Sequence, residues 1–407
     1  MRRPGFPGDI WPDEIQELLL QAALRGDGRG SAAWSAVRPR IDVDHLPGEL
    51  HRLMPLLSKT LTTSGVDDPD LARLKGVYQF SWYRNTMLFT DAAELLRQLS
   101  AADIRTMLLR GAAIAIGYRG DAGTRAMNDV DVLVPPADLD RARSVARSAG
   151  WLPLVMAQPL ERRIAAAPVR NTHGRLVRLH WQPSANLSLP GSPWDELWQR
   201  AVPVRVRETS TRMPSAADHL VHACVDGARA NSGSSLRWIA DVMVILSARA
   251  AQMNWDVVVA EARRLRVSLL LSDALRYLQE TLDASVPPSA LAALRKTPTN
   301  FRDRLGHRLS LNTTPRVASA GDIMGRFVRF TADMTIFQAA ATVPNFAATV
   351  LDVEPGRRLP MIALKKVARA AVSPTPPLAS LSKAGAATTS SSDGARRETS
   401  ESGLFAG

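Results

Sequence analysis

The chain reads RAMNDVDVLV from Arg125 to Val134, and this run holds two carboxylates among β-branched residues, a composition that predicts a strand. Because strand side chains alternate between two faces, Asp129 and Asp131 point one way and the valines point the other. Two acids roughly 7 Å apart on one face suit one or two hard cations such as Mg²⁺, which takes oxygen ligands. The alternative is a pair of solvated acids at a strand end, because short motifs also arise by chance.

A glycine precedes this strand, in the run LLRGAA at residues 108–113. The pattern predicts a strand near residues 105–109, then a turn and a helix. A glycine at such a turn lets backbone N–H groups approach a phosphate closely. Gly111 is therefore a candidate phosphate-binding residue.

Arg125 is the candidate for a second phosphate contact, because it lies just before the acidic strand. A guanidinium group there suits bidentate binding of a β- or γ-phosphate. The alternative is a surface arginine that forms an ion pair with Asp121 or Asp129. The sequence leaves both interpretations open.

These two runs resemble the pattern of a known family, the uncharacterised nucleotidyltransferases of the polymerase-β-like superfamily often found in bacterial biosynthetic clusters. The family pattern has leucines, Lys-Gly and small residues, then Arg-x-Met-x-Asp-hydrophobic-Asp-Leu-hydrophobic-Val and a long helix. The likeness extends over most of residues 10–285. Further matching segments are Glu17 to Leu20, Tyr83 to Asn85, Leu179 to Trp181, Trp194 to Trp198 and Ala217 to His222.

The resemblance implies the chemistry of nucleotidyl transfer. Asp129 and Asp131 would hold Mg²⁺, and an acceptor hydroxyl would attack the α-phosphorus of a nucleoside triphosphate, with ATP as the expected donor. Pyrophosphate would leave. Gly111, Ala112 and Arg125 would bind the triphosphate. The resemblance does not name the acceptor, so a small molecule, a peptide and a protein all stay open.

Two departures from the family pattern bear on activity. The family usually has Gly-Ser or Gly-Gly where this chain has Gly111 and Ala112. The family also places a third carboxylate on a neighbouring strand, commonly in Asp-Leu-His-Trp, and Arg178 stands at that position here. Arginine stays charged and neither binds a cation nor takes up a proton. Strand alternation puts His180 on the face of Arg178, so His180 is a candidate general base, with a backbone-bonded histidine as the alternative.

Two further groups of residues are candidate ligand sites, but we expect both to be structural. His219 and His222 lie three residues apart on a predicted helix, with Asp226 one turn further, which is a spacing that suits a metal. No cysteine or further histidine is near in the sequence, so we expect an ordinary helix face. Trp238 and Asp241 suit base stacking and ribose recognition, but a tryptophan in an amphipathic helix is more often a core residue.

Composition sets limits on the class of protein. The 407 residues carry a formal charge of +12, which is compatible with anionic partners, but the basic residues are spread out and no aromatic-interleaved nucleic-acid motif appears. The single Cys224 excludes an intramolecular disulfide and fits a reducing cytoplasm. No stretch is typical of a secretory signal or a membrane span.

The pattern along the chain predicts an α+β protein. We expect an N-terminal helical region at 1–100, a small mixed-sheet nucleotidyltransferase-like α/β unit at 101–210, and a C-terminal helical region at 211–372. Residues 373–407 are rich in Pro, Ala, Ser, Thr and Gly, so this tail is expected to be disordered because it has little to bury.

Three functional hypotheses follow. The first is a Mg²⁺-dependent nucleotidyltransferase that uses Asp129, Asp131 and His180. The second, which rests on Arg178, is a catalytically weakened member that serves as a nucleotide-binding or scaffolding partner. The third is a nucleic-acid-binding protein that uses the basic residues of 357–369, and it predicts a steep salt dependence of binding.

Overall fold

The computed structural model describes residues 5–8, 10–154, 165–184, 194–229, 236–311 and 327. The helices are α1 (Glu14–Leu24), α2 (Gly28–Val37), α3 (Gly48–His51), α4 (Met54–Thr63), α5 (Leu71–Ala101), α6 (Arg110–Ile114), α7 (Leu139–Ser148), α9 (Asp195–Arg200), α10 (Ala216–Gly227), α11 (Arg237–Arg249), α12 (Trp255–Arg264), α13 (Ser268–Leu282), α14 (Pro288–Arg295) and α15 (Phe301–Ser310). The strands are β1 (Met107–Leu109), β2 (Asp129–Leu133), β3 (Leu152–Pro153), β4 (Ala166–Arg170), β5 (Leu176–His180), β6 (Val202–Val206) and β7 (Thr209–Met213).

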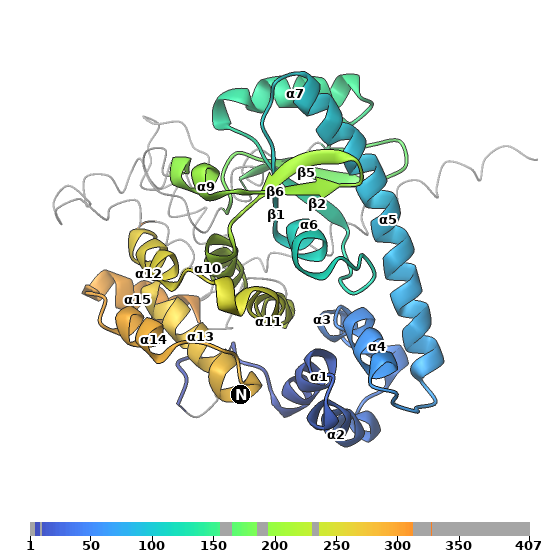
Figure 1. Cartoon of the computed structure of the whole chain (residues 1–407), viewed down its shortest axis with the longest axis vertical. Helices are drawn as coiled ribbons and strands as arrows, with labels where there is room; N and C mark the ends of the chain where they lie inside the picture. Colours follow the sequence, from blue (N-terminus) through green and yellow to red (C-terminus); the bar gives the residue numbers. More distant parts are fainter. Residues whose placement is uncertain are drawn as a thin grey trace, which may run out of the picture.

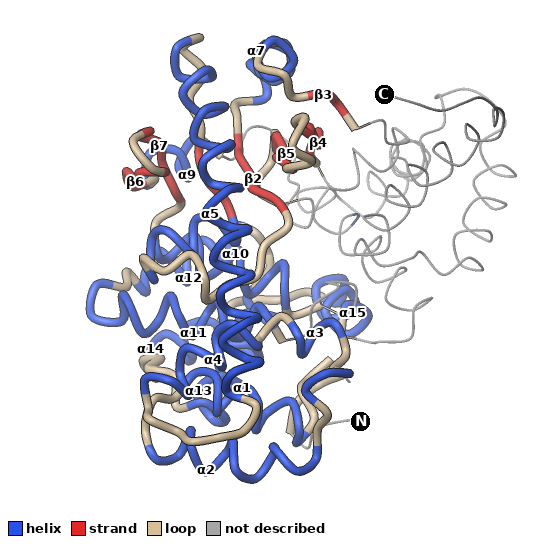
Figure 2. The backbone as a smooth tube through the Cα atoms, turned by 90° about the vertical axis from the view of Figure 1, so that its right-hand side faces the viewer, coloured by secondary structure: helices blue, strands red, loops and turns tan. Residues whose placement is uncertain are grey.

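Within the described ranges the strands form one mixed sheet of seven strands in the order β3-β4-β5-β2-β1-β7-β6. The central strand β2 runs antiparallel to β1 and parallel to β5. On the far side of β1, β7 pairs with it in parallel. The strands gather at one end of the molecule, with most of the helices at the other end (Figure 2). The expected α+β class, a small mixed sheet accompanied by helices on both sides in the sequence, is confirmed.

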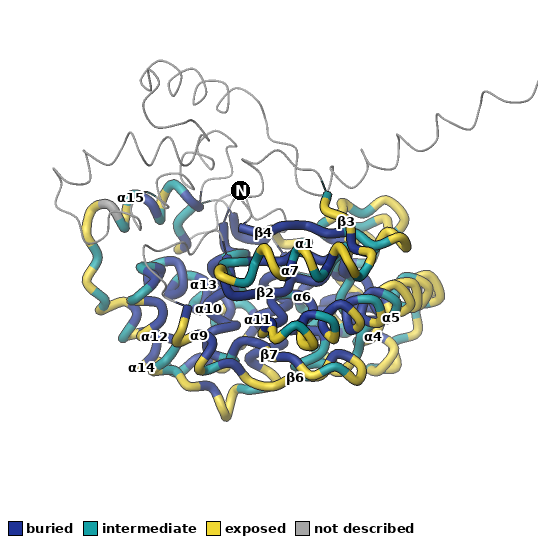
Figure 3. The backbone as a smooth tube through the Cα atoms, turned by 90° about the horizontal axis from the view of Figure 1, so that it is seen from above, coloured by how far each residue is buried: buried dark blue, intermediate teal, exposed yellow. Residues whose placement is uncertain are grey.

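One face of the sheet is apolar and is covered by α5 and α7. Val130 and Val132 of β2 and Val177 of β5 belong to the same buried cluster as Leu88 and Leu96 of α5. The long helix α5 extends from the α1–α4 group to the sheet (Figure 1). Seen from above, β2 and β4 are buried, whereas α7 is largely intermediate or exposed (Figure 3). Because the valines face this core, the acids of β2 are left on the opposite face.

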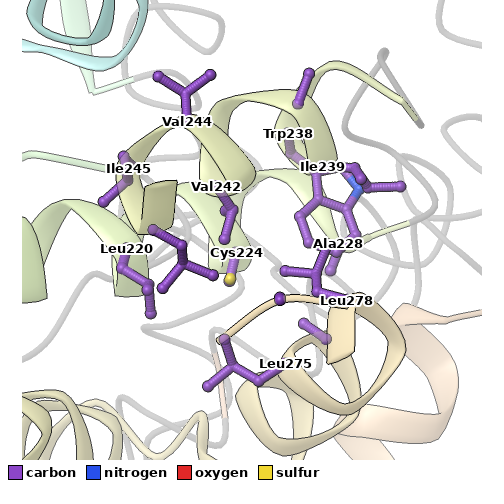
Figure 4. Packing of buried hydrophobic residues seen from close by; sticks show 14 of the residues in the cluster. Leu220, Cys224, Ala228, Trp238, Ile239, Val242, Val244, Ile245, Leu275 and Leu278 are labelled. Carbon is purple, nitrogen blue, oxygen red and sulfur yellow. The ribbon is translucent and has the colours of Figure 1, made fainter. Parts of the chain in front are cut away.

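The helices α10, α11 and α13 share a second apolar core (Figure 4). Leu220 and Cys224 of α10 pack toward Ile239 and Val242 of α11 in this cluster. At the end of α10 the two helices approach so closely that a Cβ added to Gly227 would lie 1.9 Å from the Cβ of Trp238. A glycine is therefore required at this crossing.

We expect Gly227→Ala to lower the free energy of unfolding by about 1–3 kcal/mol, because the added methyl group overpacks the α10–α11 contact. Urea unfolding followed by circular dichroism measures this change. Gly76, exposed in the middle of α5 with no atom within 4 Å of an added Cβ, provides the matched control. Gly76→Ala is expected to raise stability by about 0.5–1 kcal/mol. An equal change in the free energy of unfolding for the two variants would contradict the close approach of α10 and α11.

Some elements differ from the sequence-based expectation. Residues 203–207 of the sequence predict a short edge strand, and the structure has β6 there, at Val202–Val206. The sequence does not predict the hairpin partner β7, because Thr209-Ser210-Thr211-Arg212 has no apolar run. Residues 155–164 and the expected disordered tail at 373–407 lie outside the described residues. Among the helices that the structure does describe, none has both the length and the apolar character that a bilayer span requires.

Candidate functional site

The acids of β2 and the polar residues of β5 meet on the face of the sheet opposite α5. The parallel pairing places Arg178 beside Asp131 and His180 beside Leu133. The Arg178 Nη2 atom lies 2.5 Å from Asp129 Oδ2, and its Nη1 atom lies 3.6 Å from Asp131 Oδ1. Arg178, which stands where the resemblance leads us to expect a third carboxylate, therefore pairs with both candidate metal ligands.

A second arginine, Arg110, is the first residue of α6, directly after β1, and its side chain reaches Asp131. Its φ is 48°, a left-handed conformation that strains a residue with a side chain. Its Nη1 atom lies 3.4 Å from Asp131 Oδ1, and its Nε donates to Asp226 Oδ2 of α10 at 3.1 Å. Ser184 donates to the other oxygen of Asp226. Sequence reasoning did not assign a role to Arg110, although it directly precedes Gly111.

His180 is buried beside this pair, with 1% of its side chain exposed. Burial lowers the pKa of His180, and the attraction of Asp131 does not offset it. The neutral imidazole therefore donates from Nε2 to Asp131 Oδ1, at 2.7 Å. Nδ1 has no hydrogen-bond partner within the described residues. In this arrangement His180 orients Asp131, and its role as a general base stays a prediction.

Arg125 forms a bidentate pair, but with neither of the partners that the sequence suggested. Its Nε and Nη2 atoms donate to the two carboxylate oxygens of Asp241 in α11, at 2.8 and 2.9 Å. Asn85 of α5 donates to the Arg125 carbonyl at 2.7 Å and so fixes the segment before β2. The guanidinium lies over Gly111, where an added Cβ would come within 2.0 Å of Nη1. A side chain at position 111 would therefore displace the Arg125 guanidinium from this position.

Gly111 and Ala112 are both buried in α6, a helix of five residues. This helix is too short for its dipole to form an anion site without other groups.

The other residues considered as site candidates lie among buried residues of the helical core. His219 and His222 are buried, and Trp238 belongs to the core of α10 and α11. Across the described ranges, no three His, Cys, Asp or Glu side chains are grouped so as to hold a metal ion.

The electrostatics of the two acids follow from these contacts. Burial acts to raise the pKa of Asp131, but Arg110, His180 and Arg178 outweigh burial and hold that pKa below its usual range. Burial raises the pKa of Asp129 against the attraction of Arg178, and repulsion from Asp131 adds to this rise. Two permanent cations already lie against these carboxylates. As arranged, Asp129 and Asp131 do not fit Mg²⁺, which needs free anionic oxygens.

Comparison with known proteins shows which family the chain belongs to. An antigenic nucleotidyltransferase-like protein from Paracoccidioides brasiliensis, known from its crystal structure, shares 18% sequence identity over 51% of this chain and 92% of its own, with a TM-score of 0.33. No curated protein matches the sequence. The sequence does match the uncharacterised nucleotidyltransferase family over residues 49–283, more than half of the chain, and the protein therefore belongs to that family.

Proposed function

We propose that this protein binds a nucleoside triphosphate, with ATP as the first candidate, where β1, β2 and β5 meet. We further propose that it transfers the nucleoside monophosphate to an acceptor hydroxyl only slowly. Membership of the nucleotidyltransferase family supports the substrate class. The observation that carries the proposal of slow transfer is the contact of 2.5 Å between Arg178 and Asp129.

The charges around the acids support binding of an anion rather than a dication. Each of four carboxylates already has an arginine partner: Asp129 with Arg178, Asp131 and Asp226 with Arg110, and Asp241 with Arg125. With three arginines against four carboxylates, only one negative charge is left uncompensated, and every carboxylate already has a cationic partner that a metal ion would have to displace. Guanidinium groups bind phosphate oxygens bidentately, and a triphosphate competes with the carboxylates for them.

This arrangement gives the residues distinct tasks. Arg110 and Arg178 would bind phosphate oxygens, and His180 would hold Asp131 in one orientation. Metal binding at Asp129 and Asp131 would require Arg178 to leave Asp129, so we propose that Mg²⁺ affinity is weak. The second candidate function, a nucleotide-binding or scaffolding partner without transfer, rests on the same ion pair. A screen of nucleoside triphosphates, with mass detection of adducts on candidate acceptors, separates the two.

We expect Asp129→Asn to tighten ATP binding in the presence of EDTA by about three- to tenfold, because it frees Arg178 from a partly buried ion pair. Isothermal titration calorimetry measures this change. Asp140→Asn is the matched control, since Asp140 is 96% exposed on α7 and the substitution alters the net charge equally. If both variants bind ATP alike, Asp129 does not compete with the nucleotide for Arg178.

A further inference from the structure

A cavity of about 430 Å³ lies in the C-terminal helical region, between α12, α13 and α15. Its volume suits a small molecule, because ligand sites in proteins commonly measure about 300–1,000 Å³. In Figure 1 these helices lie on the side of α10 away from α5. Helix α15 begins beyond residue 283, where the family match ends, so family membership does not imply this cavity. The titratable or hydroxyl-bearing residues of its described lining include Arg229, Arg263, Arg266, Ser268, Asp303 and His307.

The first turn of α13 forms one wall of the cavity, since residues 268–270 all line it. The first α-helical hydrogen bond runs from the Leu271 N–H to the Val267 carbonyl, at 2.9 Å. The N–H groups of residues 268–270 therefore have no partner inside the helix, and among the described residues no side chain caps this end. Together with the dipole of a helix of 15 residues, these N–H groups favour a negatively charged group in the cavity.

Two buried polar atoms of the lining residues have no hydrogen-bond partner. Ser268 is 3% exposed, and its hydroxyl group makes no hydrogen bond within the described residues. His307 of α15 binds Asp273 through Nε2, at 2.8 Å, and its Nδ1 atom has no partner in the described ranges either. Buried polar atoms are nearly always paired, because an unpaired one has lost its hydrogen bonds to water. The Ser268 hydroxyl group, beside the N–H groups of the first turn, therefore indicates a ligand that accepts hydrogen bonds.

The charges around the cavity also favour an anion. Among the lining residues that the structure describes, Asp303 is the one acid, and it accepts two hydrogen bonds from Arg266, at 3.0 and 2.8 Å. Arg263, which is exposed at the end of α12, donates from Nε to the Thr297 hydroxyl at 3.2 Å. No carboxylate of the described residues lies at ion-pair distance from Arg263. Arg263 therefore brings a positive charge to the cavity that no acid of the described lining balances.

We infer that this cavity binds a phosphate monoester of a small organic molecule. Phosphate oxygens would accept hydrogen bonds from the first N–H groups of α13, the Ser268 hydroxyl and the Arg263 guanidinium. A phosphate suits these donors better than a carboxylate, because it has three terminal oxygens and a charge of about −1.5 to −2. Leu269, Leu270 and Pro298 also line the cavity and would contact the organic part. The inference does not rest on the proposed function, since it concerns a different part of the fold.

The first test compares three probes, inorganic phosphate, phenyl phosphate and benzoate, whose binding to the full chain is measured by calorimetry. Phenyl phosphate is expected to bind at least about threefold more tightly than inorganic phosphate, because its ring buries apolar surface in the cavity. It should also bind at least about threefold more tightly than benzoate, which has one oxygen and about one charge fewer. Equal affinity for phenyl phosphate and benzoate would overturn the assignment of a phosphate. Equal affinity for phenyl phosphate and inorganic phosphate would overturn the assignment of an organic ester.

The second test uses Ser268→Ala and Arg263→Gln, each of which removes one donor to the phosphate oxygens. Each is expected to weaken phenyl phosphate binding by at least about fivefold. The melting temperature of ligand-free Ser268→Ala should equal or exceed that of the wild type, because an unpaired buried hydroxyl group is removed. The rise in melting temperature that phenyl phosphate causes should be smaller in this variant. A merely structural Ser268 would give the opposite result, a lower melting temperature with unchanged affinity.

Three further variants serve as controls. Ser247→Ala removes an exposed hydroxyl group on α11, and Arg295→Gln removes a charge at the end of α14, outside the described lining. Both should leave phenyl phosphate affinity within about twofold of the wild type, and so should Arg178→Ala. If Arg178→Ala abolishes binding while Ser268→Ala and Arg263→Gln retain it, the phosphate binds between β2 and β5 and the inference is wrong. It is also wrong if the wild type binds neither phosphate nor phenyl phosphate at about 10 mM.

Discussion

Arg178→Asp is expected to tighten Mg²⁺ binding by at least about tenfold and to raise nucleotidyl transfer to a similar degree. The substitution removes a positive charge that lies 2.5 Å from Asp129 and adds a third carboxylate on β5. The local charge thus changes by two units in favour of a dication, whose preferred ligands are carboxylate oxygens. Calorimetric titration of Mg²⁺ with and without ATP measures the binding, and mass detection of adducts measures the transfer.

Two controls separate the effects of position and charge. Arg212→Asp makes the same charge change at an exposed position on β7 and should leave Mg²⁺ binding unchanged. Arg178→Ala removes the cation without adding a ligand and should give an intermediate affinity. A fast wild-type transferase that Arg178→Asp slows would show that Arg178 binds phosphate during turnover. In that case the assignment of Arg178 as an obstacle to the metal would be wrong.

Asp241→Ala is expected to lower the free energy of unfolding by about 2–4 kcal/mol, because it leaves a mostly buried guanidinium without its partner. The side chains of Arg125 and Asp241 are each 12% exposed, and both Arg125 donors to Asp241 would be lost at once. Arg125 cannot turn toward Gly111, which it already contacts closely. Urea unfolding followed by circular dichroism gives the change in stability.

The double substitution Arg125→Met with Asp241→Leu tests the cause. Replacing both charges by apolar side chains of similar size should recover most of the lost stability, because no unpaired charge remains. Surface substitution of Asp140 by Ala serves as the control and should change the stability by less than about 0.5 kcal/mol. If Asp241→Ala lowered the free energy of unfolding by less than about 0.5 kcal/mol, Arg125 would have found another partner.

The parts of the fold that depend on local pattern were predicted well from the sequence. The alternation of acids and valines predicts the strand that forms β2. The helical spacing of apolar residues from Leu71 to Leu99, inside the expected helical region at 1–100, corresponds to α5. Strand β7 was missed because Thr and Ser contribute little hydrophobic signal, although Thr211 of β7 hydrogen-bonds to Thr106, the residue directly before β1. Such pairing is a property of two distant segments and has no local signature.

The same limit applies to the candidate site. The sequence placed Asp129, Asp131, Arg178 and His180 on common strand faces, because this follows from a period of two. It did not predict that Arg125 pairs with Asp241, because the partner lies on a helix and nothing local indicates which helix packs there.

The partners of the site's ion pairs are far apart in the sequence, and this separation matters while the ribosome synthesises the chain. Arg110 and Asp226, like Arg125 and Asp241, are 116 residues apart, and β1 must also wait for β7. At about 5–20 residues per second, a ribosome leaves these arginines without their partners for on the order of ten seconds. Closing such long loops is slow as well as entropically costly. The nascent segment from β1 to β2 therefore emerges with Arg110 and Arg125 unpaired, and a chain that stops before α11 lacks Asp241, the partner of Arg125.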